Sequence, residues 1–265
     1  MILLGSDLAR SGRDVRATDG REQAITALAR GNVYNLLASV FGEAPSPRIV
    51  RAIVDGTLPR ALRGAGLDQL ASDLEAYAQR RQGDELLREL EVEHARLFTV
   101  PGPSYVPPYQ SLYCDGDGED SKARPRKRNR FDKRQLWGDS AVAAQRVYRE
   151  AGLLVRGELP EIPDHIALEL QFMHHLCSRE AQALNGDRTE IASESVRLQK
   201  AFLENQLLPW VERFCQAASR ATDHPFYRAM AALTVAFVLG DASELRELGD
   251  EADSTVEQCS TAVVT

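Results

Sequence analysis

The sequence has few cysteines, and none of them form a Cys-x-x-Cys pair. Its four cysteines, Cys114, Cys177, Cys215 and Cys259, are irregularly spaced along 265 residues. Free thiols at ordered positions are a common choice in protein cores. This usage argues against a disulfide scaffold and fits a reducing compartment, so we expect a cytoplasmic protein.

Long hydrophobic runs are also missing. The longest nearly apolar stretch covers residues 230–239, about half of what a membrane-spanning helix needs. Residues 1–4 are apolar, but Gly5, Ser6 and Asp7 follow at once and no basic segment precedes them. We therefore expect neither a membrane span nor a secretory signal.

The motifs of common catalytic sites are absent: there is no GxxxxGK[ST], GxGxxG, GxSxG or HExxH. The formal net charge of −7 argues against nucleic acid as the main partner. The best candidates for metal ligands are His94, His165, His174, His175 and Glu169. Adjacent His174 and His175 would point about 100° apart on a helix, so they cannot share one face. We expect no metal site and no cofactor.

Helical periodicity is what the sequence has in abundance. Apolar residues recur with a 3.6-residue period in nearly every ordered stretch, and no stretch alternates as a strand would. The pattern predicts an all-α fold of about nine to eleven helices, in one globular domain over residues 21–248. Residues 1–20 and 249–265 lack this pattern and are expected to be a disordered arm and a disordered tail.

Some helices have clear limits in the sequence. One should end before Gly42, and another should run from Pro163 to about Leu184, where Asn185 and Gly186 break it. A long helix is expected over residues 191–215, with a bend at Pro209.

A strongly basic segment covers residues 116–135. It has eight Lys and Arg and four Asp and Glu side chains, a net charge of +4, and almost no apolar residues. We expect an exposed, mobile loop. A nucleic-acid site is disfavoured because acids are interspersed and Phe131 is the only aromatic residue for stacking.

The most informative segment is PDHIALELQFM at residues 163–173. It reads as a helix with Pro163 in its first turn and with Asp164 where the helix dipole favours a carboxylate. Asp164 and His165 suit three roles: holding the helix start and a nearby loop, contacting a ligand, or acting with Glu169 as an acid–base group. The last role describes a small helical hydrolase or nucleotide-dependent enzyme. No nucleophile stands at a recognisable spacing, so binding is favoured over catalysis.

Four motifs taken together resemble a known family. They are RLF at 96–98, PPYQSLY at 107–113, YREAGL at 148–153 and PDHI at 163–166. In this order and spacing they are similar to the TorD/DmsD/NarJ family of redox-enzyme maturation chaperones, over roughly residues 24–239. PPYQSLY most resembles the branch serving type II enzymes of the dimethyl-sulfoxide (DMSO) reductase family. Ile162 departs from the family, which often has proline there, and the basic segment resembles an insertion.

The resemblance implies an all-helical cytoplasmic chaperone without enzymatic activity, monomeric or homodimeric. Its partner would be the catalytic subunit of a molybdenum oxidoreductase of the DMSO reductase superfamily. Such chaperones bind the twin-arginine signal peptide or the N-terminus of that subunit. They hold it until the molybdenum cofactor is inserted, which delays export.

The resemblance also implies where a peptide would bind. Asp164 would pair with an arginine at the polar end of a groove, where Glu169 would orient His165 beside Pro163. The groove wall would come from the other two motifs: Leu97, Phe98, Pro107, Pro108, Tyr109, Ser111 and Tyr113.

Overall fold

The computed structural model describes residues 6–81, 83–115, 137–153 and 162–261, with side chains described between residues 20 and 247. Eleven α-helices and no strand occur within these ranges, which confirms the predicted all-α domain. The basic segment 116–135 lies outside the described residues. None of the described helices combines the length and apolar character needed to cross a membrane.

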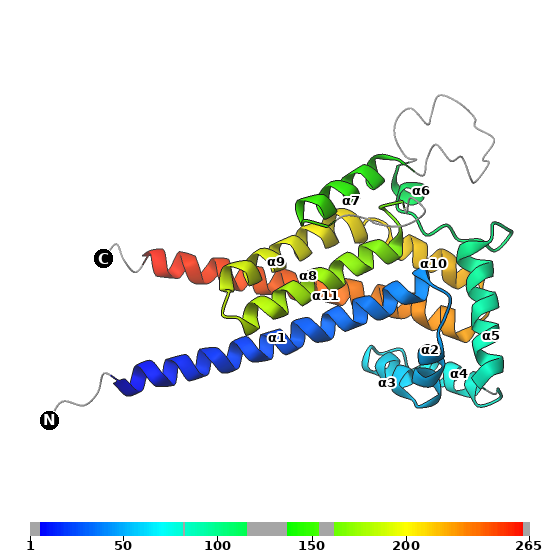
Figure 1. The fold of residues 1–265 in the computed structure, drawn as a ribbon, viewed down its shortest axis with the longest axis horizontal. Coiled ribbons are helices and arrows are strands. Elements are labelled where there is room, and N and C mark those ends of the chain that lie inside the picture. The colour runs from blue at the N-terminus through cyan, green and yellow to red at the C-terminus, as the bar shows by residue number, and fades with distance from the viewer. Residues whose placement is uncertain (1–5, 82, 116–136, 154–161, 262–265) are drawn as a thin grey trace.

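The helices differ widely in length, and two π-helical turns, η1 and η3, separate some of them (Figure 1). In chain order they are α1 (Ser6–Gly42), α2 (Pro47–Val54), α3 (Thr57–Gly64), α4 (Asp68–Ala78), α5 (Gly83–His94), η1 (Ala95–Thr99), α6 (Ser111–Cys114), α7 (Asp139–Glu150), α8 (Ile166–Asn185), α9 (Thr189–Phe202), η3 (Leu203–Leu207), α10 (Val211–Ala221) and α11 (Pro225–Thr261).

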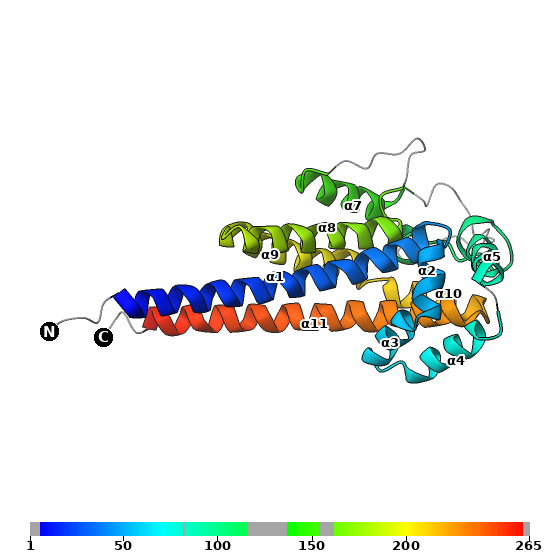
Figure 2. The same cartoon turned by 60° about the horizontal axis from the view of Figure 1, so that its bottom comes forward.

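Helices α1, α8, α9 and α11 run along the long axis of the molecule, and α5 crosses that direction at one end (Figures 1 and 2). The most extensive packing is between α1 and α8, followed by α8 with α9 and α10 with α11. The N-terminal end of α1 and the C-terminal end of α11 both project from the end opposite α5 (Figure 2).

Aromatic side chains fill the core near α5. Phe41 of α1 meets Phe98 and Phe214 edge-on, with ring centroids 5.5 and 5.2 Å away. Trp210, at the start of α10, is completely buried. Edge-to-face ring pairs of this kind add stability beyond that expected from the apolar area they bury.

Glycine allows α1 to approach α8 closely. A Cβ atom placed on Gly42 would lie 2.7 Å from the Cβ of Ala167, and one on Gly31 would lie 3.1 Å from the Cβ of Cys177. A side chain at position 42 would force α1 and α8 apart, whereas one at position 31 would require a small shift of its neighbours.

A buried polar network ties four helices together. Arg30 of α1 forms an ion pair with Asp241 of α11 and donates to Gln199 of α9 at 2.6 Å. Its guanidinium also lies 3.4 Å from Glu180 of α8. Tyr34 donates to Asp241 at 2.6 Å. Because the groups are buried, this network specifies how α1, α8, α9 and α11 pack.

The first and last helices reach into the segments that the sequence analysis assigned to an arm and a tail. Helix α1 begins at Ser6, and α11 continues to Thr261. Proline is absent from both segments. Both segments project from the end of the molecule opposite α5 (Figure 2).

The long helix predicted over residues 191–215 is interrupted. Helix α9 ends at Phe202, η3 follows, and Pro209 precedes α10. Proline has no N–H to continue the helical hydrogen bonds, so the chain breaks here rather than bends. Helix α3 was not predicted, although Leu58 and Leu62 lie on its buried face and Pro59 lies in its first turn.

Candidate functional site

The two most informative motifs lie side by side. Tyr109 and His165 form an isolated antiparallel bridge. On either side of it, the N–H of Gln110 donates to the carbonyl of Asp164 at 3.0 Å, and the N–H of Ile166 donates to that of Pro108 at 2.9 Å. The structure therefore brings PPYQSLY and PDHI together through their backbones.

Asp164 is completely buried beneath this bridge. Its Oδ2 accepts a 2.7 Å hydrogen bond from the backbone N–H of Ser111. Burial raises the pKa of Asp164, and the hydroxyl and N–H of Ser111 oppose that rise in part. The carboxylate thus holds the start of α6 and has no face open to a peptide arginine in this conformation.

His165, rather than Asp164, caps α8. The helix begins at Ile166, and Nδ1 of His165 accepts from the N–H of Ala167 at 3.1 Å. The prediction that Pro163 opens the helix and Asp164 complements its dipole is therefore wrong. Pro163 lies in the preceding turn, where its carbonyl accepts from the hydroxyl of Tyr148 at 3.0 Å.

The His165 imidazole is neutral near pH 7. Burial, aided by the nearby His94, lowers its pKa to about 4. Its ring meets Tyr109 edge-on, with centroids 5.1 Å apart. Because Nδ1 caps α8 and Asp164 turns toward Ser111, the acid–base arrangement of the alternative hydrolase hypothesis is not assembled.

Glu169 is also completely buried, and it accepts from Nε1 of Trp210 at 3.0 Å rather than orienting His165. Burial raises its pKa well above the ordinary value, more than the bond to Trp210 lowers it, and Asp164 adds to the rise. Among the described atoms, Oε1 of Glu169 and Oδ1 of Asp164 have no hydrogen-bond donor. Both carboxyl groups are therefore favoured in the protonated form compared with a carboxyl in water.

Both π-helical turns support the same segment. The N–H of Val106 donates to the carbonyl of Leu97 in η1 at 2.7 Å. The side-chain amide of Gln110 donates to the carbonyl of Gln206 in η3 at 2.9 Å. Turns of this type often occur at functional sites. Gln206 and Trp210 also belong to this cluster, although no local sequence pattern predicts either contact.

Most of the predicted peptide-facing residues are internal. Leu97, Phe98, Pro108, Ser111, Pro163, Asp164 and Glu169 are buried. Pro107, Tyr109, Tyr113 and His165 are partly exposed, and we call these four the bridge surface. The predicted residues thus form one cluster, in which the bridge surface is accessible and the others support it.

The metal candidates do not converge. Within the described ranges, no group of three His, Cys, Asp or Glu side chains is arranged to hold a metal ion. Nδ1 of His174 lies 2.8 Å from the carbonyl of Gly31 in α1. His94 is buried against the rings of Phe98 and Tyr227. These two histidines take part in packing between helices.

The fold is all-helical, and its described residues place buried carboxyl groups and a neutral imidazole beneath partly exposed aromatic side chains, an arrangement that suits binding better than acid–base chemistry. The chain is also similar to known proteins. Residues 61–216 match the family model described as nitrate reductase delta subunit. The chaperone protein TorD of Photobacterium profundum is 30% identical over 84% of this chain and 95% of its own length. TorD of Shewanella pealeana is 26% identical over 82% of this chain and 89% of its own.

The chain belongs to the TorD/NarJ family. A third relative, TorD of Vibrio vulnificus, is 29% identical over 82% of this chain and 94% of its own length. Because these relatives are chaperones and span most of the chain, the protein is a chaperone of this family rather than an enzyme.

Proposed function

We propose that the protein is a cytoplasmic chaperone for the maturation of a molybdenum oxidoreductase of the DMSO reductase superfamily. It binds the twin-arginine signal peptide of the catalytic subunit, or the start of that subunit, until the molybdenum cofactor is inserted. The observation that carries the proposal is the Tyr109–His165 bridge, which joins two family-like motifs in a chain of the TorD/NarJ family.

The bridge surface has the chemistry for the apolar part of a signal peptide. Tyr109 and His165 present an edge-to-face pair of rings, and rings of this kind give large contact areas at low cost in side-chain entropy. Since the pKa of His165 is lowered to about 4, the surface carries no imidazolium charge that would repel the arginines of the peptide.

The supporting residues reduce the cost of binding. Pro107 and Pro108 restrict the backbone beside Tyr109, and Asp164 fixes the following segment through Ser111. A surface that is already ordered loses less conformational entropy when a ligand binds. In this proposal Asp164 and Glu169 position the bridge surface and do not touch the peptide.

The test is recovery of the client from the native host. The full chain, immobilised, should retain the catalytic subunit of a molybdenum oxidoreductase carrying a twin-arginine leader, identified by mass spectrometry. A type II enzyme of the DMSO reductase family is the expected client. A Tyr109→Ala/His165→Ala variant with native thermal stability should retain much less. Recovery of no such subunit by the original chain would refute the proposal.

A further inference from the structure

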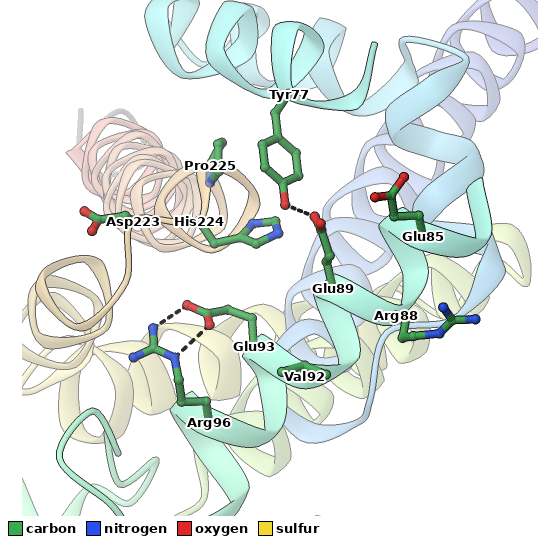
Figure 3. A pocket seen from close by; sticks show the side chains of 10 residues that line it. All are labelled: Tyr77, Glu85, Arg88, Glu89, Val92, Glu93, Arg96, Asp223, His224 and Pro225. Carbon is green, nitrogen blue, oxygen red and sulfur yellow. Dashed lines mark hydrogen bonds and ion pairs between the residues drawn. The ribbon is translucent and has the colours of Figure 1, made fainter. Parts of the chain in front are cut away.

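A cavity lies between α5 and the turn that joins α10 to α11, and none of the four residues of the bridge surface lines it (Figure 3). We call it the α5 groove. Its volume is about 680 Å³, within the range of about 300–1,000 Å³ that is usual for ligand sites. The residues used below are Glu85, Glu89, Val92 and Glu93 of α5, Tyr77 of α4 and Asp223 of the turn.

The lining of the α5 groove is negatively charged. Four carboxyl side chains and two guanidinium groups line it, a net charge of −2 with its histidine neutral. Arg88, one of the two arginines, points away from Tyr77 and the turn (Figure 3). The other, Arg96, pairs with Glu93 at 2.5 Å.

Two of the carboxylates are already held in place. Tyr77 donates to Glu89, Arg81 pairs with Glu89 at 2.6 Å, and both interactions lower the pKa of Glu89. Burial raises the pKa of Glu93, but Arg96 and Thr222 lower it on balance. Both groups are therefore charged near pH 7. With Arg81 counted as well, the groove still keeps a net charge of −1.

The other two carboxylates make no close polar contact. Glu85 and Asp223 are exposed, and within the described residues neither has a side-chain hydrogen bond or ion pair, although Asp223 lies near enough to Arg96 to help raise the pKa of that guanidinium. They lie near opposite ends of the groove, on either side of Tyr77 and His224 (Figure 3). Between them Val92 is 65% exposed, among the most exposed large apolar side chains of the described residues.

We propose that the α5 groove binds a short cationic segment of the client, with basic side chains at Glu85 and Asp223 and an aliphatic side chain on Val92. This inference rests on the proposed function, because a twin-arginine leader supplies both cations and apolar residues. Charge complementarity selects this occupant, since a groove with excess carboxylates disfavours an acidic one.

The α5 groove and the bridge surface are linked along the chain through η1. Arg96, which lines the groove, belongs to η1, and the carbonyl of the next residue, Leu97, accepts from the N–H of Val106 in the segment that leads to Tyr109.

The probe is a synthetic peptide with two adjacent arginines followed by an apolar stretch of leucine and alanine. Its affinity for the full chain is measured by calorimetry at low and at physiological salt. The variants are Glu85→Lys, Asp223→Lys, their combination and Val92→Ser. Glu91→Lys is the matched control, since Glu91 is exposed on α5 but does not line the groove.

The double charge reversal should weaken binding about tenfold at low salt and less at physiological salt, because exposed charges are screened. Glu91→Lys should change the affinity less than twofold. A peptide with glutamates in place of the arginines should bind the double variant better than the original chain. Thermal unfolding should be unchanged in every variant.

The failures can be told apart. If the original chain binds the peptide and the double variant behaves as Glu91→Lys does, the α5 groove is not the site, while the proposed function stands. If the original chain binds neither the peptide nor a molybdenum-enzyme subunit, both proposals fail.

Discussion

The carboxylate of Asp164 is bonded to the backbone N–H of Ser111, 53 residues earlier in the chain, at 2.7 Å. The bond joins the turn before α8 to the start of α6, next to the Tyr109–His165 bridge. It explains how a charged residue in a binding motif can be completely buried. Under the proposed function, Asp164 positions the bridge surface and does not itself contact the peptide.

Replacing Asp164 should therefore reduce stability. Asp164→Ala leaves the N–H of Ser111 buried without its acceptor, a change that costs about 1–3 kcal/mol. Urea denaturation should show this loss of unfolding free energy. Glu91→Ala, at an exposed position on α5, is the control and should change it little. If Asp164→Ala unfolds with the same free energy as the original chain, Asp164 does not hold the segment around Ser111 in place.

Glu169 should make stability depend on pH. Its pKa is raised above the ordinary value of 4.5, so the folded protein binds more protons than the unfolded chain above about pH 4.5. The unfolding free energy should then fall as pH rises, by up to about 1.4 kcal/mol per pH unit until the folded-state pKa is passed. Glu169→Gln should remove this contribution and leave a smaller slope from Asp164. The measurement is the urea midpoint of the original chain and of Glu169→Gln at several pH values between 5 and 9. If the two midpoints change with pH in parallel, Glu169 does not contribute to the pH dependence of stability.

The close packing of α1 on α8 predicts opposite effects for two glycine substitutions. Gly42→Ala places a methyl group 2.7 Å from the Cβ of Ala167 and should cost about 1–3 kcal/mol. Gly240→Ala, in α11 with nothing within 4 Å, should stabilise by about 0.5–1 kcal/mol because alanine favours a helix more than glycine does. Thermal denaturation measures the melting temperature of each variant. Equal shifts of the melting temperature would contradict the close contact between position 42 and Ala167.

Removing Asp241 should destabilise the packing of the long helices. Asp241→Ala leaves Arg30 without its main ion-pair partner and the hydroxyl of Tyr34 without its acceptor. Breaking a buried pair in this way costs about 3–5 kcal/mol. Since Glu180 and Gln199 remain beside Arg30, the lower end is expected. Glu75→Ala, which breaks the exposed pair with Arg63, should leave the urea midpoint nearly unchanged.

The sequence predicted the helices with a buried face and missed the features that depend on distant partners. Periodicity identified the packed parts of α1, α4, α8 and α11, and Asn185 and Gly186 marked the end of α8. The outer ends of α1 and α11 were expected to be disordered because their sequences show no apolar repeat of 3.6 residues. The break after Phe202 was missed because a π-helical turn has no local signature.

The candidate site was predicted as a set of residues but not in its roles. The resemblance placed Tyr109, Ser111, Asp164 and His165 together, and the structure joins them. It did not show that Asp164 turns inward to Ser111, or that Glu169 meets Trp210, 41 residues later. Such pairs depend on how whole helices pack, which local spacing does not encode.

The most direct test of the account is the affinity of the full chain for the leader peptide of the recovered client, measured by calorimetry. Tyr109→Ala should weaken binding about tenfold, or 1.4 kcal/mol, because it removes half of the exposed ring pair. Trp137→Ala, at a half-exposed position outside the bridge surface, should leave the affinity unchanged. Equal affinity of Tyr109→Ala and the original chain, at equal thermal stability, would contradict the claim that the bridge surface binds the client.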